Sequence, residues 1–285
     1  MAPQLLPTAS ASASALLLFL LVATATASAS ASATRTSRSA PPTLVFLLAG
    51  QSNMGGRGGA TNGTWDGVVP PDCAPSPRIL RLAPDLRWEQ AREPLHAGID
   101  LHNALGVGPG MPFARAVLRA RRLPPHAVIG LVPCAQGATP ITSWARATPL
   151  YDRMLARARA ALLLPSTASG KPPKLAALLW YQGEADTIRR QDAGLYTARM
   201  EAFVRDVRRD LAAPDLLVIQ VGLATGQGRF VDLVRDAQRK VSLPNVRYVD
   251  AKGLPVAADY THLTTPAQVQ LGRMLANAYL ATLAH

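Results

Sequence analysis

The sequence predicts an α/β fold in which five strands form a parallel sheet covered by helices on both faces. Short runs rich in Val, Ile and Leu alternate with longer amphipathic segments, and strands of this kind are typical of sheets buried on both sides. Regular alternation of strand and helix indicates a parallel sheet. The predicted strands are 44–49, 126–135, 175–181, 216–223 and 246–250. The predicted helices are 110–122, 150–164, 193–211, 229–241 and 265–283.

The first 33 residues have the composition of an export signal. An apolar block, Ala15–Val22, precedes an Ala/Ser/Thr run that ends in Ala31-Ser32-Ala33, which fits the small-x-small rule for signal cleavage. The block is too short to span a bilayer. We therefore expect a signal peptide over 1–33, a linker over 34–42 and one folded domain over 43–285, in a secreted protein. The lack of acidic residues in this region also suits a plastid transit peptide, which is the alternative.

The formal net charge of +12 comes almost wholly from arginine. The arginines are spread along predicted helices and form no stripe interleaved with aromatic residues, which argues against a nucleic-acid partner. The positive charge either draws a secreted protein to acidic polysaccharides or reflects solvated helix faces. Arg57, within G-G-R-G-G, is a candidate to meet an acidic substrate at the mouth of a pocket.

Two cysteines and one sequon bear on processing. In a secreted protein Cys73 and Cys134 can form a single disulfide, which would tie a long loop to a strand end. Cys134 lies in an apolar run and equally suits a buried free thiol. Asn62-Gly63-Thr64 predicts N-glycosylation of Asn62 if the chain enters the secretory path.

A serine follows the first predicted strand directly. The apolar run stops at Gly50 and continues as Gln51-Ser52-Asn53 and a cluster of glycines. A serine at the carboxyl end of a buried strand lies at the edge of the crevice where α/β sheets bind ligands. The turn also leaves backbone N–H groups unpaired beside the hydroxyl. Ser52 is therefore a candidate nucleophile or, alternatively, a helix cap. The long irregular segment 55–103 is expected to form a wall of the pocket.

A second group of candidates lies just before the last predicted helix. The start of that helix is marked by a cap, a first-turn proline and a capping-box residue at Thr265, Pro266 and Gln268. Asp259 and His262, three residues apart on the preceding loop, can point into one crevice. The carboxylate can then accept one imidazole N–H while the other ring nitrogen faces Ser52.

Acyl transfer also needs donors for an oxyanion, and three strand ends offer them. The candidates are the backbone N–H groups of Ser52 and Gly137 and the side-chain amide of Gln182. Glu184 would repel an oxyanion, so we expect it to hold loops in place. Trp144, in the loop after Gly137, either stacks on a sugar ring or packs in the pocket wall.

Four motifs carry a family resemblance: G-Q-S-N-M at 50–54, C-A-Q-G-A-T at 134–139, W-Y-Q-G-E-A-D at 180–186 and D-Y-T-H at 259–262. With them the sequence resembles the SGNH/GDSL hydrolase superfamily, and most closely its carbohydrate esterase branch, the sialate O-acetylesterase-like proteins of plants. It departs from the wider superfamily at two places. The first block is not G-D-S, and Gln182-Gly183-Glu184 stands where many members have Gly-x-Asn.

The resemblance implies a three-layer, flavodoxin-like fold that needs no metal cofactor. It implies a serine esterase that removes O-acetyl groups from carbohydrate. With the predicted export signal, we expect the enzyme in the apoplast or cell wall. Ser52 would be the nucleophile, His262 the base and Asp259 its orienting partner, with oxyanion donors at Ser52, Gly137 and Gln182. Gln51 and Asn53 are candidates for support or substrate contact. A lipase-like acyl-ester hydrolase and an inactive carbohydrate-binding homologue are the alternatives, and the oligomeric state is left open.

Overall fold

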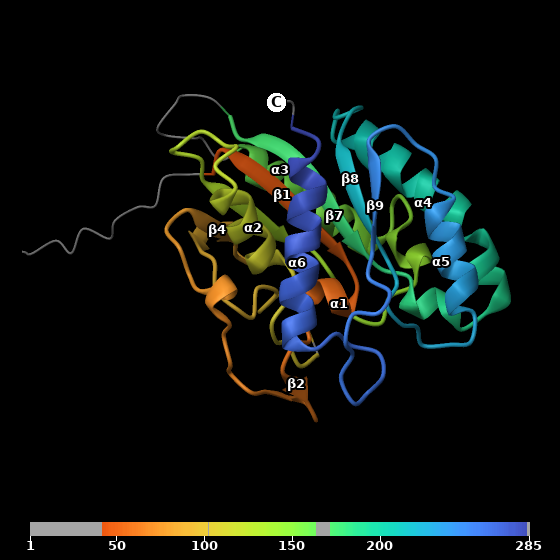
Figure 1. The fold of residues 1–285 in the computed structure, drawn as a ribbon. Coiled ribbons are helices and arrows are strands. Elements are labelled where there is room, and N and C mark those ends of the chain that lie inside the picture. The colour runs from red at the N-terminus through yellow and green to blue at the C-terminus, as the bar shows by residue number, and fades with distance from the viewer. Residues whose placement is uncertain (1–41, 102, 164–171, 284–285) are drawn as a thin grey trace, which may run out of the picture. The chain divides into compact units, whose positions relative to one another are not determined.

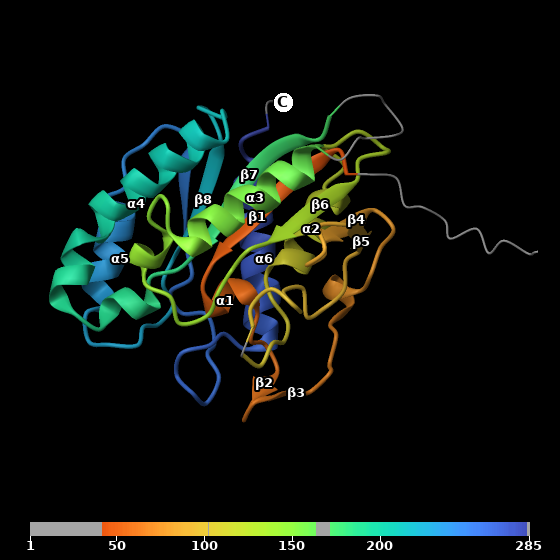
Figure 2. The same ribbon diagram turned by 180° about the vertical axis from the view of Figure 1, so that it is seen from behind.

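Seven strands form one sheet in this computed structural model, which describes residues 42–101, 103–163 and 172–283. The predicted signal peptide and nearly all of the predicted linker lie outside the described residues. The strand order is β5-β4-β6-β1-β7-β8-β9, and every neighbouring pair is parallel except β4 and β5 (Figure 1 and Figure 2). The strands are β1 (Leu44–Gly50), β4 (Ile79–Leu82), β5 (Trp88–Gln90), β6 (Ile129–Pro133), β7 (Lys174–Tyr181), β8 (Leu217–Gly222) and β9 (Val246–Asp250).

The number of strands corrects the prediction of five. All five predicted strands are present, but β4 and β5 lie in the segment 55–103 that was expected to be irregular. They are four and three residues long, too short to show a strand pattern in the sequence. Both are strands because of their pairing: β4 pairs in parallel with β6, and β5 pairs antiparallel with β4. A small hairpin, β2 (Ala60–Thr61) with β3 (Thr64–Trp65), occupies another part of the segment.

Helices cover both faces of the sheet, as predicted. On one face α2 (Gly110–Arg119) and α6 (Thr265–Leu280) pack together (Figure 1). On the other face lie α3 (Pro149–Leu163), α4 (Arg190–Asp210) and α5 (Val231–Arg239) (Figure 2). Within the part of the chain that the structure describes, no helix has the length and apolar character needed to cross a bilayer.

The winding of the sheet reverses at β1. β6 and β7 are the two neighbours of β1 in the sheet. The chain enters β6 from α2, which lies on one face of the sheet, and then crosses to β7 through α3, which lies on the other face. Residues 45–50 of β1 are all buried because both faces of this central strand are covered. The carboxyl ends of β6, β1 and β7 meet at one edge, which is where open α/β sheets bind ligands.

Gly50 allows the chain to leave β1 at this edge. Its φ is +127°, and a Cβ atom there would lie 2.1 Å from the backbone oxygen of Tyr181 on β7. The N–H of Gln51 donates to the same oxygen at 2.8 Å. Only glycine fits this close approach of two backbones, and the turn that follows carries Ser52.

The start of α6 differs from the prediction by one residue. The cap is Thr264, whose hydroxyl oxygen accepts a hydrogen bond from the N–H of Ala267 at 3.4 Å, and not Thr265. Gln268 makes no capping box. Its side-chain amide donates instead to the backbone oxygen of Asn53 at 3.1 Å, so the last helix is tied directly to the turn after β1.

Cys73 and Cys134 are both free and buried, so the structure contains two separate thiols and not the disulfide. Burial raises the pKa of both, that of Cys134 to about 11, so neither is a reactive thiolate at neutral pH. Asn62 is exposed in the turn between β2 and β3. Its glycosylation stays a prediction.

Candidate active site

Ser52 is the first residue of α1 (Ser52–Gly55), a single helical turn that follows β1. The N–H groups of Met54 and Gly55 both donate to the backbone oxygen of Gln51 at 2.9 Å. The N–H groups of Ser52 and Asn53 have no acceptor among the described residues. A short helix start with two free N–H groups is suited to receive an oxygen that carries negative charge.

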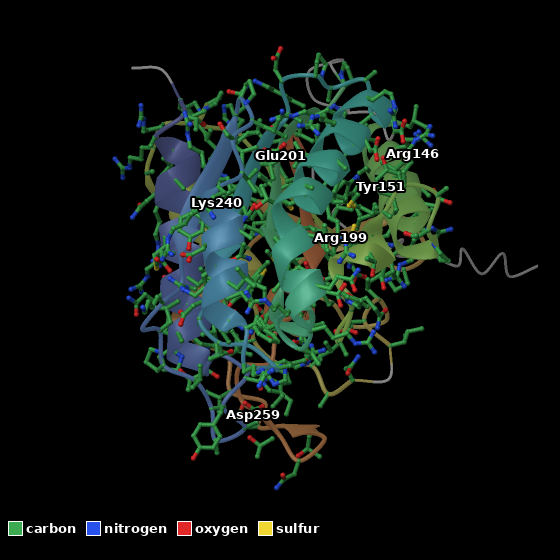
Figure 3. The ribbon with its side chains drawn as sticks, turned by 90° about the vertical axis from the view of Figure 1, so that its right-hand side faces the viewer. Arg146, Tyr151, Arg199, Glu201, Lys240 and Asp259 are labelled. Atoms are coloured by element: carbon green, nitrogen blue, oxygen red, sulfur yellow. The ribbon has the colours of Figure 1, made fainter. Side chains whose placement is uncertain are left out.

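The structure brings the three predicted side chains together. His262 Nε2 lies 2.9 Å from Ser52 Oγ, although the two residues are 210 positions apart. His262 Nδ1 lies 2.7 Å from Asp259 Oδ2. Figure 3 shows Asp259 on a loop at one end of the sheet and helices, away from the labelled Arg146 and Tyr151. The three groups thus form a continuous hydrogen-bonded chain from carboxylate to hydroxyl.

Asp259 is held as an acceptor. Its Oδ1 receives the backbone N–H groups of Thr261 and His262, each at 2.9 Å. Burial alone would raise its pKa, but these two hydrogen bonds and the imidazole outweigh burial and hold the pKa below its usual value. The carboxylate is therefore ionised at neutral pH and orients the imidazole with Nδ1–H toward itself.

Asn53 fastens the histidine loop to the serine turn. Its Nδ2 donates to Glu184 Oε1 at 2.8 Å and to the backbone oxygen of Thr261 at 3.2 Å. Its Oδ1 accepts the N–H of Leu263 at 2.9 Å. Asn53 is fully buried, and its side chain holds the residues on both sides of His262, while Gln268 holds the backbone of Asn53 itself. Support of the site, one of the two roles expected for Asn53, is what the structure shows.

Glu184 has the loop-holding position that the sequence predicted for it. It is fully buried, one oxygen accepts from Asn53, and the other, Oε2, has no partner among the described residues. Burial raises its pKa to about 7. The neutral acid still accepts the bond from Asn53, whereas the ionised form leaves a charge poorly compensated.

Glu184→Gln is expected to remove a pH-dependent loss of stability. The pKa is 4.5 in the unfolded chain and about 7 in the folded protein, so wild-type stability falls as pH rises through this range. The shift corresponds to a loss on the order of 3 kcal/mol, which the variant cannot show because its amide does not ionise. Denaturant unfolding at pH 5 and pH 8 measures it, with Glu89→Gln, at a half-exposed glutamate, as the matched control. An equal pH dependence in wild type and Glu184→Gln would contradict the assignment.

Gln182 does not present a free amide, contrary to the prediction of an oxyanion donor. Its Nε2 donates to Asp186 Oδ2 at 2.6 Å and to the backbone oxygen of Thr139 at 3.0 Å. Its Oε1 accepts from the hydroxyl of Tyr196 at 3.1 Å. The side chain is fully buried, so it joins the loop after β6 to the turn after β7.

Gln51 supports the same turn from the other side. Its Oε1 lies 3.5 Å from the N–H nitrogen of Gly183 and 3.4 Å from that of Ala185. Gln51 is fully buried, its Oε1 contacts hold this turn, and its Nε2 has no hydrogen-bond partner among the described residues.

The N–H of Gly137 is also engaged, since it donates to Asp100 Oδ1 at 3.0 Å. Of the three predicted oxyanion donors, only that of Ser52 lacks an acceptor among the described residues. Arg57 is buried and pairs with Asp100 at 2.6 Å, so it does not stand at a pocket mouth. Sequence reasoning missed Asp100. In the sequence Asp100 is only an acidic residue within the long segment 55–103, and nothing near it indicates that it pairs with Arg57 or accepts the N–H of Gly137.

Trp144 is a core residue. It is fully buried, packs edge-to-face on Trp180 with ring centroids 5.3 Å apart, and donates Nε1–H to the hydroxyl oxygen of Thr139 at 3.1 Å. With no exposed surface, the indole packs in the core and has no face open to a sugar ring in this structure.

The doubly wound sheet, with serine, histidine and aspartate in contact at its carboxyl edge, has the arrangement of a serine hydrolase. The chain belongs to the family "Carbohydrate esterase, sialic acid-specific acetylesterase", whose model matches residues 42–281. It is accordingly a carboxylic ester hydrolase.

Relatives agree with this membership. The chain is 50% identical over 247 residues to "Probable carbohydrate esterase At4g34215" of Arabidopsis thaliana, covering 85% of this chain and 92% of that protein. The X-ray structure of the Arabidopsis AT4G34215 protein superimposes with a TM-score of 0.79 at 48% identity, covering 86% of this chain and all of the other. A "Probable 9-O-acetyl-N-acetylneuraminic acid deacetylase" of Escherichia coli K12 is 27% identical, with 58% of this chain and 61% of that protein covered.

Proposed function

We propose that this protein is a serine esterase that hydrolyses O-acetyl esters on carbohydrate, with Ser52 as nucleophile, His262 as general base and Asp259 as orienting carboxylate. The contact of 2.9 Å between Ser52 Oγ and His262 Nε2 carries the proposal. A serine hydroxyl is a weak nucleophile until a base within hydrogen-bond reach takes its proton. The second contact, 2.7 Å from His262 to Asp259, supplies the group that fixes the tautomer of that base.

The reaction proceeds in two halves. Ser52 Oγ attacks the acetyl carbonyl carbon while His262 Nε2 takes the hydroxyl proton, and the carbonyl oxygen becomes an oxyanion. Collapse of this intermediate breaks the bond to the sugar oxygen, which receives the proton from His262, and leaves acetyl-Ser52. Water then attacks the acetyl carbon while His262 takes a proton from it, the bond between the acyl carbon and Ser52 Oγ breaks, His262 returns the proton to Oγ, and acetate leaves.

The start of α1 supports stabilisation of the oxyanion. The free N–H of Ser52 is positioned by the single turn that follows Gly50, and preorganised donors of this kind are worth most in a site from which water is excluded. We assign Gly137 as a second donor once its N–H is released by Asp100. Gln182 is not assigned as a donor, because acceptors within the protein already use its amide.

A groove near the carboxyl ends of β6 and β7 bears on the substrate. It adjoins Gly137 and the turn that carries Glu184, has a volume of about 440 Å³ and is open to solvent, but Ser52, His262 and Asp259 do not line it. Its lining is mixed, with four apolar residues (Ala138, Pro140, Ala185 and Ile188) and four polar ones (Thr142, Arg189, Asp192 and Gln227). The polar side chains offer hydrogen bonds to the hydroxyl groups of a sugar ring, so the groove is compatible with a carbohydrate. The family description and the names of the Arabidopsis and Escherichia coli relatives support the same substrate class.

Acetate release from acetylated pectin, acetylated xylan and O-acetylated sialic acid is expected for at least one of the three. Among p-nitrophenyl esters we expect acetate to be cleaved fastest, because the matching family is one of acetylesterases. Faster hydrolysis of longer acyl chains would contradict the acetylesterase assignment and favour a lipase-like enzyme. Failure of a fluorophosphonate to label the protein would favour an inactive binding homologue.

A further inference from the structure

A buried ion pair lies between the serine turn and the loop after β6. Arg57 Nη2 is 2.6 Å from Asp100 Oδ2, and the two side chains are 6% and 0% exposed. Arg57 follows α1, and Asp100 belongs to the segment between β5 and α2. The chemistry of Ser52, His262 and Asp259 uses neither residue. A buried ion pair is weak evidence for stability alone, so its position calls for another explanation.

The carboxylate of Asp100 is a four-way acceptor. In addition to Arg57, its Oδ1 accepts from the N–H of Gly137 at 3.0 Å, from Gln136 Nε2 at 2.8 Å and from Asn103 Nδ2 at 2.8 Å. Two of these four bonds go to consecutive residues of the loop after β6. Asp100 is therefore the acceptor that holds the N–H of Gly137 and the side chain of the residue before it.

Glycines bring both loops against the pair. A Cβ atom on Gly137 would lie 2.7 Å from Arg57 Nη2. On the other side, a Cβ atom on Gly55 would lie 3.0 Å from Asp100 Oδ2 and 3.2 Å from Arg57 Nη1. Arg57 also donates Nη1–H to the backbone oxygen of Gly56 at 3.0 Å. The ion pair is thus a spacer between the turn that carries Ser52 and the loop that carries Gly137.

We propose that Arg57 and Asp100 are positioning residues for the oxyanion hole, an inference that rests on the proposed esterase function. In the substrate-free protein Asp100 holds the N–H of Gly137. When the oxyanion forms beside the N–H of Ser52, it competes for that donor, while Gln136, Asn103 and Arg57 keep Asp100 in place. Arg57 compensates the carboxylate, whose charge would otherwise repel the oxyanion across a medium of low dielectric constant.

Asp100→Ala is expected to lower both kcat and kcat/KM for a chromogenic acetate by about 10- to 100-fold with little change in KM. The reason is that a misplaced oxyanion donor affects the transition state and not substrate binding. Asp100→Asn keeps an oxygen for Gly137 but turns an amide N–H₂ toward Arg57, so it should recover part of the lost rate. A merely structural role would not separate kcat from KM in this way.

Asp250→Asn is the matched control. It breaks the ion pair of another buried arginine, Arg235, which lies 2.8 Å from Asp250 and joins α5 to β9. It should lower the melting temperature and leave kcat unchanged where the protein is folded. If Asp100→Ala does not fold, Asp100→Asn decides. A kcat in folded Asp100→Asn equal to or above that of the wild type would overturn the inference alone. Absence of any ester hydrolysis by the wild-type protein would overturn the proposed function, and this inference with it.

Discussion

Ser52→Ala and His262→Ala are each expected to lower kcat/KM for an acetate ester by about 10⁴-fold or more, because nucleophile and base act as one unit. The hydroxyl and the imidazole lie 2.9 Å apart, so loss of either leaves the other without a function in acyl transfer. Release of p-nitrophenol measures the rate. Fluorophosphonate labelling followed by peptide mass analysis should place the adduct on Ser52.

Ser242→Ala is a suitable control for the serine variant. Ser242 lies in the connection between α5 and β9, at the amino end of that strand and so at the edge of the sheet opposite the site. Its variant should hydrolyse acetate at the wild-type rate. Near wild-type turnover in folded Ser52→Ala or His262→Ala would refute the mechanism.

Asp259→Asn is expected to lower kcat by about 10³- to 10⁴-fold while leaving the loop in place. The remaining side-chain oxygen still accepts from the N–H groups of Thr261 and His262, which hold the loop. The new amide would present N–H₂ to His262 Nδ1 and favour the tautomer with its proton on Nε2, which cannot accept the proton of Ser52.

Steady-state kinetics with thermal melting distinguishes this effect from unfolding. Asp206→Asn, at a surface ion pair of α4 with Arg209, is the matched exchange and should change neither quantity by much. If Asp259→Asn retained more than about a tenth of the wild-type kcat, the orienting role would be wrong, since wrong-tautomer losses in serine hydrolases are far larger.

The five long strands and five helices were predictable because their signals are local. The apolar run of β1 and the helical spacing in α4 are properties of consecutive residues. In contrast, β4 and β5 are strands only through their pairing with β6 and with each other. The cap of α6 shows that the sequence places the start of a helix only to within one residue. Thr264 and Thr265 have the same chemistry, and Pro266 fits the first turn in either register.

Within the site, predictability depended on residue type. A serine after a buried strand and an Asp-x-x-His before a helix indicate their chemistry by themselves, and the structure places the three side chains in contact. A glutamine does not indicate a particular role, because its side-chain amide serves equally well in catalysis and in holding loops together. Gln182 was assigned as an oxyanion donor, yet Asp186 and the backbone of Thr139 use its amide.

The sequence by itself determined the sheet's long strands, the helices and the identity of the three residues proposed for acyl transfer, because each depends on neighbours along the chain. The tertiary structure alone decided which N–H groups are free and which are taken. It showed that Asp100 accepts the N–H of Gly137 and that Arg57 compensates the carboxylate. These contacts join segments 37 and 43 residues apart, and such a hydrogen bond depends on where the folded backbone places donor and acceptor, which residue type does not specify.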